Sequence, residues 1–115
     1  MSFRGLDIGN GKDDYEIIFK NKDNLLHRDD GPALINKYKE IWYQHGKIHR
    51  ESGPAVIIKK QILSLIPDKY YYLWGKKLSK NFFLELTQGP IENLPLYLGL
   101  GFDKIIEKRL NKKLV

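Results

Sequence analysis

Cysteine is absent from this chain of 115 residues, and long apolar runs are absent as well. Without cysteine there is no disulfide framework, no thiolate metal site and no cysteine nucleophile. The longest mostly apolar runs, at 62–66 and 96–100, are too short to cross a bilayer, so we expect no transmembrane segment. The first residues include no apolar stretch of the kind found in signal peptides, and we therefore expect an intracellular protein.

The charge balance is basic, because 20 Lys and Arg residues against 14 Asp and Glu residues give a formal net charge of +6. Residues 103–115 hold five of the basic residues and two of the acidic ones, which is half of that net charge. The rest of the chain is close to balanced for its length. With 42 % hydrophobic and 30 % charged residues, the composition is typical of one globular domain.

A duplicated segment is the main signal in the sequence. Residues 26–35 read LHRDDGPALI, and residues 48–57, which follow 22 positions later, read IHRESGPAVI. An aromatic element followed by Gly-Lys also recurs, at 42–47 and again at 71–76, 29 positions later. A fainter copy precedes both, at 17–26. Such self-similarity indicates a repeat architecture, in which neighbouring units share one core.

Each unit is predicted to be β structure. Strands are expected to start directly after the two Gly-Pro pairs, because the glycine permits an unusual turn and the proline has no N–H to donate. A further strand is expected over 40–43, which is rich in β-branched and aromatic side chains. His45 and Gly46 then occupy the position of a hairpin turn, since histidine tolerates a positive φ better than most residues. The predicted fold class is mainly β, with antiparallel repeat hairpins arranged as a meander.

The C-terminal third of the sequence has helical signals instead. Ser79 is a candidate N-cap for a helix that ends at 88–90, a Gln-Gly-Pro sequence. A short helix with proline in its first turn is expected at 94–98, and Asp103 is placed to cap a last helix with an apolar stripe. We expect two or three short α-helices to cap the repeats, which divides the chain into an N-terminal tail (1–13), a β-hairpin repeat region (14–78) and a helical cap (79–115).

The duplicated His-Arg-x-x-Gly-Pro-Ala motif, with an aromatic hairpin between its copies, resembles the divergent MORN-type repeats of many phage and large DNA virus proteins. The similarity covers about residues 15–87, and its signature residues are His27, Arg28, Gly31, Pro32, His49, Arg50, Gly53 and Pro54. The resemblance implies an elongated sheet of hairpins used for protein contacts, for scaffolding or, in some relatives, for membrane association, and it does not imply catalysis. For a viral chain it implies the host cytoplasm or the virion as the compartment.

Two departures from the MORN-like pattern affect the second hairpin. Trp74 stands where a small turn-forming residue is usual, and the insertion at 61–67 is apolar although loops are mostly polar. Two alternatives remain for this insertion: its aliphatic residues pack within the chain, or they form an exposed patch that another chain covers. The candidate interface residues are Ile62, Leu63, Leu65 and Ile66.

All three histidines, His27, His45 and His49, lie in the repeat region with acidic residues close by, so a metal or acid–base site is an alternative to a structural role. A Zn²⁺ site needs three or four ligands that converge at about 2 Å. His27 and His49 are equivalent positions of successive units and are expected about one repeat apart, each bound within its own corner. We therefore predict no catalytic residues, no metal and no cofactor, with a hydrolase at these corners as the enzymatic alternative.

The predicted function is a non-enzymatic structural or protein-interaction module that forms a homodimer or binds another protein. Aromatic residues between 42 and 74 interleave with lysines, so base stacking on a sheet surface is an alternative to their structural use. The basic side of the last helix could also rest on an anionic membrane or on nucleic acid. Nucleic-acid or anionic-surface binding is thus the alternative function.

Overall fold

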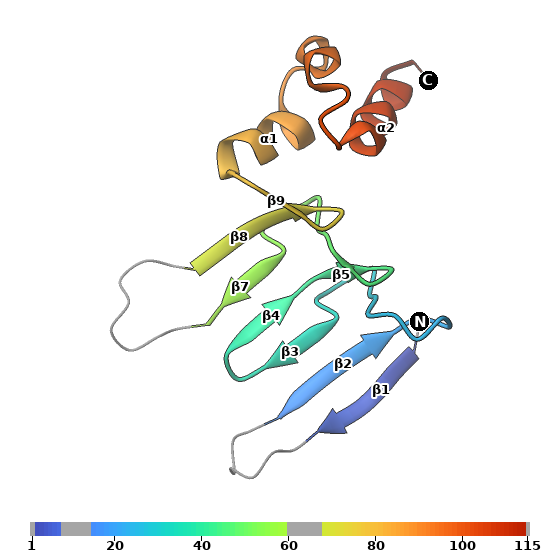
Figure 1. Ribbon diagram of the computed structural model, residues 1–115, viewed down its shortest axis with the longest axis vertical. Helices are drawn as coiled ribbons and strands as arrows, with labels where there is room; N and C mark the ends of the chain where they lie inside the picture. The colour runs from blue at the N-terminus through green and yellow to red at the C-terminus, as the bar shows by residue number, and fades with distance from the viewer. Residues whose placement is uncertain (1, 8–14, 60–67, 115) are drawn as a thin grey trace. The chain divides into compact units, whose positions relative to one another are not determined.

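The computed structural model describes residues 2–7, 15–59 and 68–114 of the chain (Figure 1). The chain divides into two compact units, residues 1–77 and 78–115. The first unit is built of strands and the second of helices. This confirms the predicted fold class, which is mainly β with antiparallel hairpins followed by short C-terminal helices.

The first unit contains a seven-stranded sheet and a separate two-stranded hairpin. In their order across the large sheet, the strands are β1 (Ser2–Asp7), β2 (Glu16–Lys20), β3 (Leu34–Asn36), β4 (Lys39–Ile41), β7 (Val56–Ile58), β8 (Asp68–Leu73) and β9 (Lys76–Leu78). The small hairpin consists of β5 (Tyr43–Gln44) and β6 (Lys47–Ile48). Apart from this hairpin, strands that follow one another in the sequence are neighbours in the sheet, which is the order expected of a meander.

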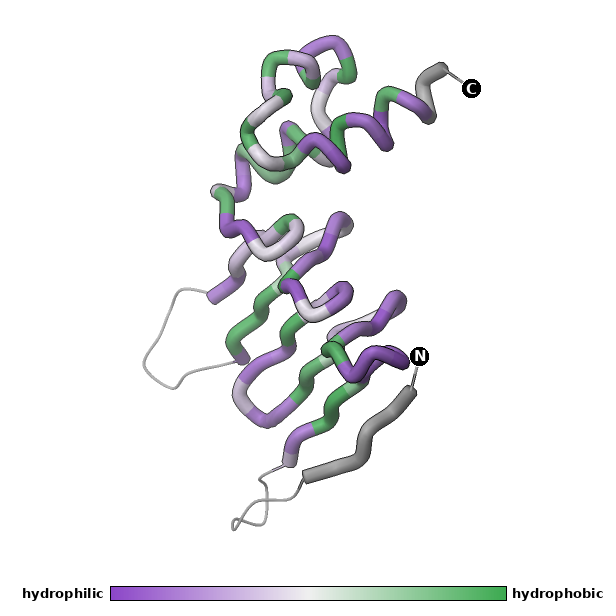
Figure 2. The backbone as a smooth tube through the Cα atoms, turned by 45° about the vertical axis from the view of Figure 1, so that its right-hand side comes forward, coloured by the Kyte–Doolittle hydropathy of each residue, from purple (hydrophilic) through white to green (hydrophobic). Residues whose placement is uncertain are grey.

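The register of the sheet places apolar residues of successive strands opposite one another. Leu34 lies opposite both Ile18 and Ile41, and Ile41 in turn lies opposite Val56. Residues that are directly opposite share one face, so these four form a row across the sheet. Hydrophobic stretches lie in β2, β3 and β7, and the turn at 21–24 is hydrophilic (Figure 2). Each cross-strand pair of this kind contributes roughly 0.2–1 kcal/mol to stability.

The N-terminal residues differ from their prediction. The sequence predicts a tail over 1–13, whereas residues 2–7 form strand β1, which pairs antiparallel with β2. Ser2 pairs with Lys20 and Asp7 with Glu16, and the register shifts between these two pairs. Without β1, the outer edge of β2 would expose unpaired backbone N–H and C=O groups, which makes that edge favourable for pairing. The local sequence did not indicate the strand because the pairing depends on this edge.

The candidate interface residues Ile62, Leu63, Leu65 and Ile66 lie outside the described residues, which resume at Asp68. The two strands on either side of the insertion, β7 and β8, are neighbours in the sheet and pair antiparallel. The role of these aliphatic residues in an interface therefore stays a prediction.

The second unit contains the helices α1 (Lys80–Gln88) and α2 (Asp103–Leu114) and the 3-10 helix η1 (Ile91–Tyr97). Ser79 is the N-cap of α1, as predicted, and its hydroxyl accepts a hydrogen bond from the backbone N–H of Phe82 at 3.1 Å. The helix expected at 94–98 is longer than predicted, since it begins at Ile91 and holds Pro95 in its interior. It is also a 3-10 helix, which winds more tightly than an α-helix. The buried apolar residues of the three helices are Phe83, Leu86, Leu94, Ile105 and Ile106.

Arg109 of α2 binds the C-terminal end of α1. Its guanidinium donates to the backbone carbonyl oxygens of Leu86 at 3.0 Å and Gly89 at 2.6 Å. Carbonyl groups at a helix end have no partner within the helix, and a cation there also interacts favourably with the helix dipole. Among the described residues, no helix has both the length and the apolar character needed to span a membrane.

Candidate functional site

The candidate site consists of two segments with the sequence His-Arg-x-x-Gly-Pro-Ala, at 27–33 and 49–55. We name them corner 1 and corner 2. Corner 1 leads into β3, and corner 2 leads from β6 into β7. They hold two of the three histidines, and the acidic residues, that are the alternative candidates for chemistry, so their geometry bears on whether the role is structural or chemical.

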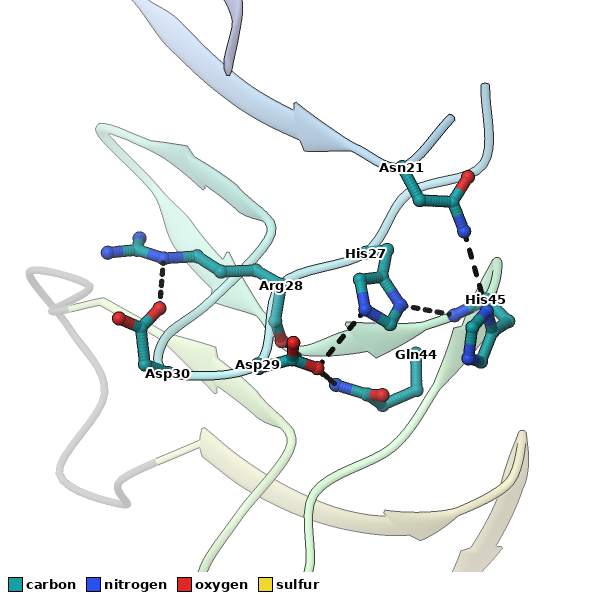
Figure 3. A network of polar contacts seen from close by, with 7 residues as sticks. All are labelled: Asn21, His27, Arg28, Asp29, Asp30, Gln44 and His45. Atoms are coloured by element: carbon teal, nitrogen blue, oxygen red, sulfur yellow. Dashed lines mark hydrogen bonds and ion pairs between the residues drawn. The ribbon is translucent and has the colours of Figure 1, made fainter. Parts of the chain in front are cut away.

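The imidazole of His27 is buried in corner 1, and its two ring nitrogens have different partners (Figure 3). Nδ1 accepts a hydrogen bond from the backbone N–H of His45 at 3.0 Å, and Nε2 lies 3.1 Å from Oδ1 of Asp29. A neutral imidazole whose Nδ1 is an acceptor carries its proton on Nε2, which here faces the carboxylate. Nε2 of Gln44 donates to the same carboxylate oxygen at 3.2 Å. The tautomer of His27 is therefore set by a backbone donor of the next hairpin.

Corner 2 repeats these contacts. Nδ1 of His49 accepts from the backbone N–H of Trp74 at 2.9 Å, and Nε2 lies 3.0 Å from Oε2 of Glu51. The indole of Trp74 stacks on the imidazole of His49 with 4.1 Å between the ring centroids. In corner 1 the ring of His45 lies in the corresponding position, 4.5 Å from that of His27. Each imidazole thus connects its own corner to the turn of the following hairpin.

The two donating turns have the same backbone conformation. The φ angles are 48° and 82° at His45 and Gly46, and 51° and 82° at Trp74 and Gly75. Two consecutive positive φ angles are typical of the type I′ turns that join tight hairpins. A positive φ is uncommon for a residue as bulky as tryptophan, and the stacking on His49 stabilises it here. The tryptophan at position 74 therefore leaves the φ angles of this turn close to those of the turn at His45.

Backbone hydrogen bonds join consecutive hairpins at equivalent positions. The N–H of Gly46 donates to the carbonyl of Leu26 at 2.8 Å, and the N–H of Gly75 donates to the carbonyl of Ile48 at 2.7 Å. The alanine that ends each corner is fully buried. The repeat in the sequence is thus also a repeat of the backbone contacts between hairpins.

The arginine of each corner lies over an aromatic ring of an earlier strand or strand end. The guanidinium carbon is 4.1 Å from the ring centroid of Phe19 for Arg28 and 3.8 Å from that of Trp42 for Arg50. Cation–π contacts contribute about 0.5–2 kcal/mol, more when they are desolvated. Partial burial lowers the pKa of Arg50 from its ordinary value, while the negative charge of Glu40 acts in the opposite direction. The guanidinium stays protonated in any case and acts as a cation.

The guanidinium of each corner also binds two groups within its own segment. Nη1 donates to the carbonyl oxygen of the corner's proline, at 3.2 Å in corner 1 and 3.1 Å in corner 2. Nε of Arg28 donates to Oδ1 of Asp30 at 3.2 Å, whereas Nε of Arg50 donates to Oγ of Ser52 at 3.2 Å. The arginines therefore have equivalent roles, with a carboxylate partner in one corner and a hydroxyl partner in the other.

The glycine of each corner leaves room for the guanidinium. A Cβ placed on Gly31 would lie 2.7 Å from Cζ of Arg28, whereas one on Gly53 would lie 3.3 Å from Cζ of Arg50. We therefore expect Gly31→Ala to lower the free energy of unfolding by about 1–2 kcal/mol, because the guanidinium is pushed from its carbonyl and aromatic partners. Gly53→Ala is the matched control and is expected to cost less than half as much. Equal losses in denaturant unfolding would contradict this reading of the corners.

The signature residues do not converge on one site. His27 and His49 lie in different corners, and each has its own carboxylate and its own backbone donor. Within residues 15–59 and 68–111, no group of three or more His, Asp or Glu side chains is placed to hold a metal ion. The contacts in both corners are those of a junction between hairpins.

Reasoning from the sequence missed the residues that the corner side chains contact. The rings of Phe19 and Trp42 lie under the guanidinium groups of the corner arginines. The backbone N–H groups of His45 and Trp74 donate to the corner imidazoles. The sequence did contain a signal for the two cation–π contacts, because an aromatic residue precedes each corner arginine by eight or nine positions. The sequence contained no signal for the imidazole contacts, because each joins a side chain to the backbone of another hairpin.

The aromatic residues that were candidates for base stacking have other contacts. Trp42 lies under a guanidinium and Trp74 lies on an imidazole. Nζ of Lys77 is 4.5 Å from the ring centroid of Tyr70, and burial raises the pKa of the Tyr43 hydroxyl. Base stacking on the sheet would therefore compete with contacts that already stabilise the fold.

Comparisons of this chain with protein-family models, with curated proteins and with solved structures gave no match. The functional conclusion therefore depends on the repeat in the sequence and on the geometry of the corners.

Proposed function

We propose that the chain is a MORN-repeat-like structural and protein-interaction module without enzyme activity. The observation that carries this proposal is that the imidazole has the same kinds of partner in both corners, and that the guanidinium binds the proline carbonyl and an aromatic ring in both. Catalysis requires polar groups that converge on a place where a reacting atom can sit. In the corners these groups bind backbone, a carboxylate or an aromatic ring instead. Their contacts hold consecutive hairpins together, and a sheet built this way offers a surface for another protein.

We further propose that the partner is a second copy of this chain, bound through the aliphatic insertion. Residues Ile62, Leu63, Leu65 and Ile66 lie in the connection between β7 and β8. Loops are mostly polar, and an apolar patch at a loop is typical of an interaction site. A two-fold dimer would bring the same segment of both copies together and would shield it from water.

The oligomeric state of the full chain tests the dimer. Light scattering at two protein concentrations is expected to give the mass of a dimer at the higher one, and the double variant Ile62→Asp/Leu65→Asp is expected to be monomeric at both. Gln61→Glu adds a negative charge to the same segment but keeps all four aliphatic side chains, so it is expected to dimerise. A wild-type chain that is monomeric throughout, or a double variant that dimerises as well as the control, would remove the proposed interface.

One observation favours the nucleic-acid alternative as a second candidate. Lys47 and Lys76 are exposed directly after the turns of two consecutive hairpins, 29 positions apart, and Lys22 is exposed in an earlier turn. Exposed lysines at successive turns suit a polyanion, and binding would then weaken steeply between about 50 and 200 mM salt. The interaction-module proposal predicts no such binding. Fluorescence anisotropy with labelled RNA and DNA over this salt range separates the two.

A further inference from the structure

The two corners differ at an exposed position two residues after the arginine, where corner 1 has Asp30 and corner 2 has Ser52. We propose that Ser52 is a phosphorylation site and that its phosphate is held by the guanidinium of Arg50. The arrangement would reproduce the ion pair in corner 1, where Nε of Arg28 lies 3.2 Å from Oδ1 of Asp30. Phosphorylation would thus give corner 2 the charge pairing that corner 1 has in its sequence.

Ser52 already contacts the group that would hold the phosphate. Its Oγ accepts from Nε of Arg50 at 3.2 Å, and Nη1 of the same guanidinium is fixed on the carbonyl oxygen of Pro54 at 3.1 Å. The guanidinium also rests on the ring of Trp42, so its orientation is set before any modification. A guanidinium held in this way forms short charge-assisted hydrogen bonds with phosphate oxygens.

The fold accommodates adjacent negative charges at this place. Corner 1 carries Asp29 next to Asp30, and the corresponding positions of corner 2 are Glu51 and Ser52. The carboxylate of Glu51 is directed to the imidazole of its own corner, as that of Asp29 is. A phosphate, with a charge of about −1.5 to −2 at pH 7, therefore gives corner 2 a charge pattern that the same backbone carries in corner 1.

Burial lowers the pKa of Arg50, and the negative charge of nearby Glu40 acts in the opposite direction. The carboxylate of Glu40 also lies 3.6 Å from Nζ of Lys59, so its charge is shared with a second cation. Glu40 therefore interacts with both Arg50 and Lys59, whereas Arg28 forms an ion pair with Asp30 of its own corner. This leaves the guanidinium of corner 2 as the one that gains most from an added anion.

Ser52 is also accessible to an enzyme. It is exposed and lies in a bend between β6 and β7, outside any helix or strand. The reaction requires a protein kinase and a nucleoside triphosphate: Oγ of Ser52 bonds to the γ-phosphorus as the bond between that phosphorus and the β,γ-bridging oxygen breaks. The nucleoside diphosphate leaves, and the hydroxyl proton passes to a base of the kinase. The phosphate would then stabilise the junction between the last two hairpins.

Thermal unfolding of the full chain with phosphoserine incorporated at position 52 tests the phosphate contact. We expect the Tm to rise by about 4 °C relative to the unmodified chain. In an Arg50→Lys background the rise is expected to fall to less than half, because an ammonium group cannot bind the carbonyl of Pro54 and the phosphate at once in the geometry of the guanidinium. The reciprocal substitutions are matched controls, with Ser52→Asp expected to raise the Tm and Asp30→Ser to lower it. A phosphoserine that lowers the Tm, or raises it equally without Arg50, would overturn the proposal.

Incubation of the full chain with Mg²⁺, ATP and an arginine-directed serine kinase tests access to the site. Mass spectrometry of the digested chain is expected to find the phosphate on Ser52, and the Ser52→Ala variant is expected to lose that phosphopeptide. Modification that occurs only at other residues would overturn the assignment of Ser52.

Discussion

Replacement of His49 by alanine is expected to lower the free energy of unfolding by about 3 kcal/mol. The substitution removes the acceptor for the backbone N–H of Trp74, the ring on which its indole stacks and the group that faces Glu51. A buried donor left without a partner costs about 1–3 kcal/mol, and the space left by the ring adds to this. Denaturant unfolding followed by tryptophan fluorescence measures the loss, because Trp74 lies directly on the ring.

His45→Asn is the matched control for this prediction. His45 is exposed, and asparagine tolerates its positive φ, so the cost is expected to be about 0.5 kcal/mol or less. His27→Ala is expected to behave like His49→Ala, since the two imidazoles have equivalent partners. The cost of His49→Asn is expected to lie between those of His49→Ala and His45→Asn, because the amide oxygen of asparagine can replace Nδ1 as an acceptor. Similar costs at positions 45 and 49 would show that the corner histidines do not hold the hairpins.

Replacement of Arg50 by alanine is expected to have the largest effect after the corner histidines, a loss of about 2 kcal/mol in the free energy of unfolding. The variant loses the hydrogen bond to the carbonyl of Pro54, the hydrogen bond to Ser52 and the contact with Trp42. The fluorescence of the folded protein is also expected to change, because a cation is removed from an indole ring.

Arg50→Lys separates charge from geometry in the same corner. An ammonium group can lie over the ring of Trp42 but cannot reach both hydrogen-bond partners at once, so less than half of the lost stability is expected to return. The unfolding midpoint of the two variants and the wild type gives the comparison directly. If Arg50→Lys is as stable as the wild type, the planar guanidinium has no special role in the corner.

The local features of this fold were predictable because they depend on neighbours in the sequence. The Gly-Pro pairs precede β3 and β7 as expected, and His45 and Gly46 form the turn that their conformational preferences indicate. Ser79 caps α1 through the backbone N–H of Phe82, a contact within one helical turn. In each of these cases the residue type and its position within a few residues contain the physical cause.

The remaining features depend on contacts between segments that are far apart in the sequence. Strand β1 forms because β2 offers an edge, and nothing within 1–13 indicates that edge. The φ of Trp74 is stabilised by a ring 25 positions earlier. The sequence showed that His27 and His49 were equivalent, but it could not show that the partner of each lies in the following hairpin.

The junction between hairpins depends on the two corner imidazoles, which act as acceptors for the backbone of the next hairpin. Through-hydrogen-bond scalar couplings between ¹⁵N nuclei measure this directly in a uniformly labelled chain. We predict one coupling between the backbone nitrogen of Trp74 and Nδ1 of His49 and another between the backbone nitrogen of His45 and Nδ1 of His27, with the proton of both rings on Nε2. The absence of both couplings, or a proton on Nδ1 of either ring, would contradict the account.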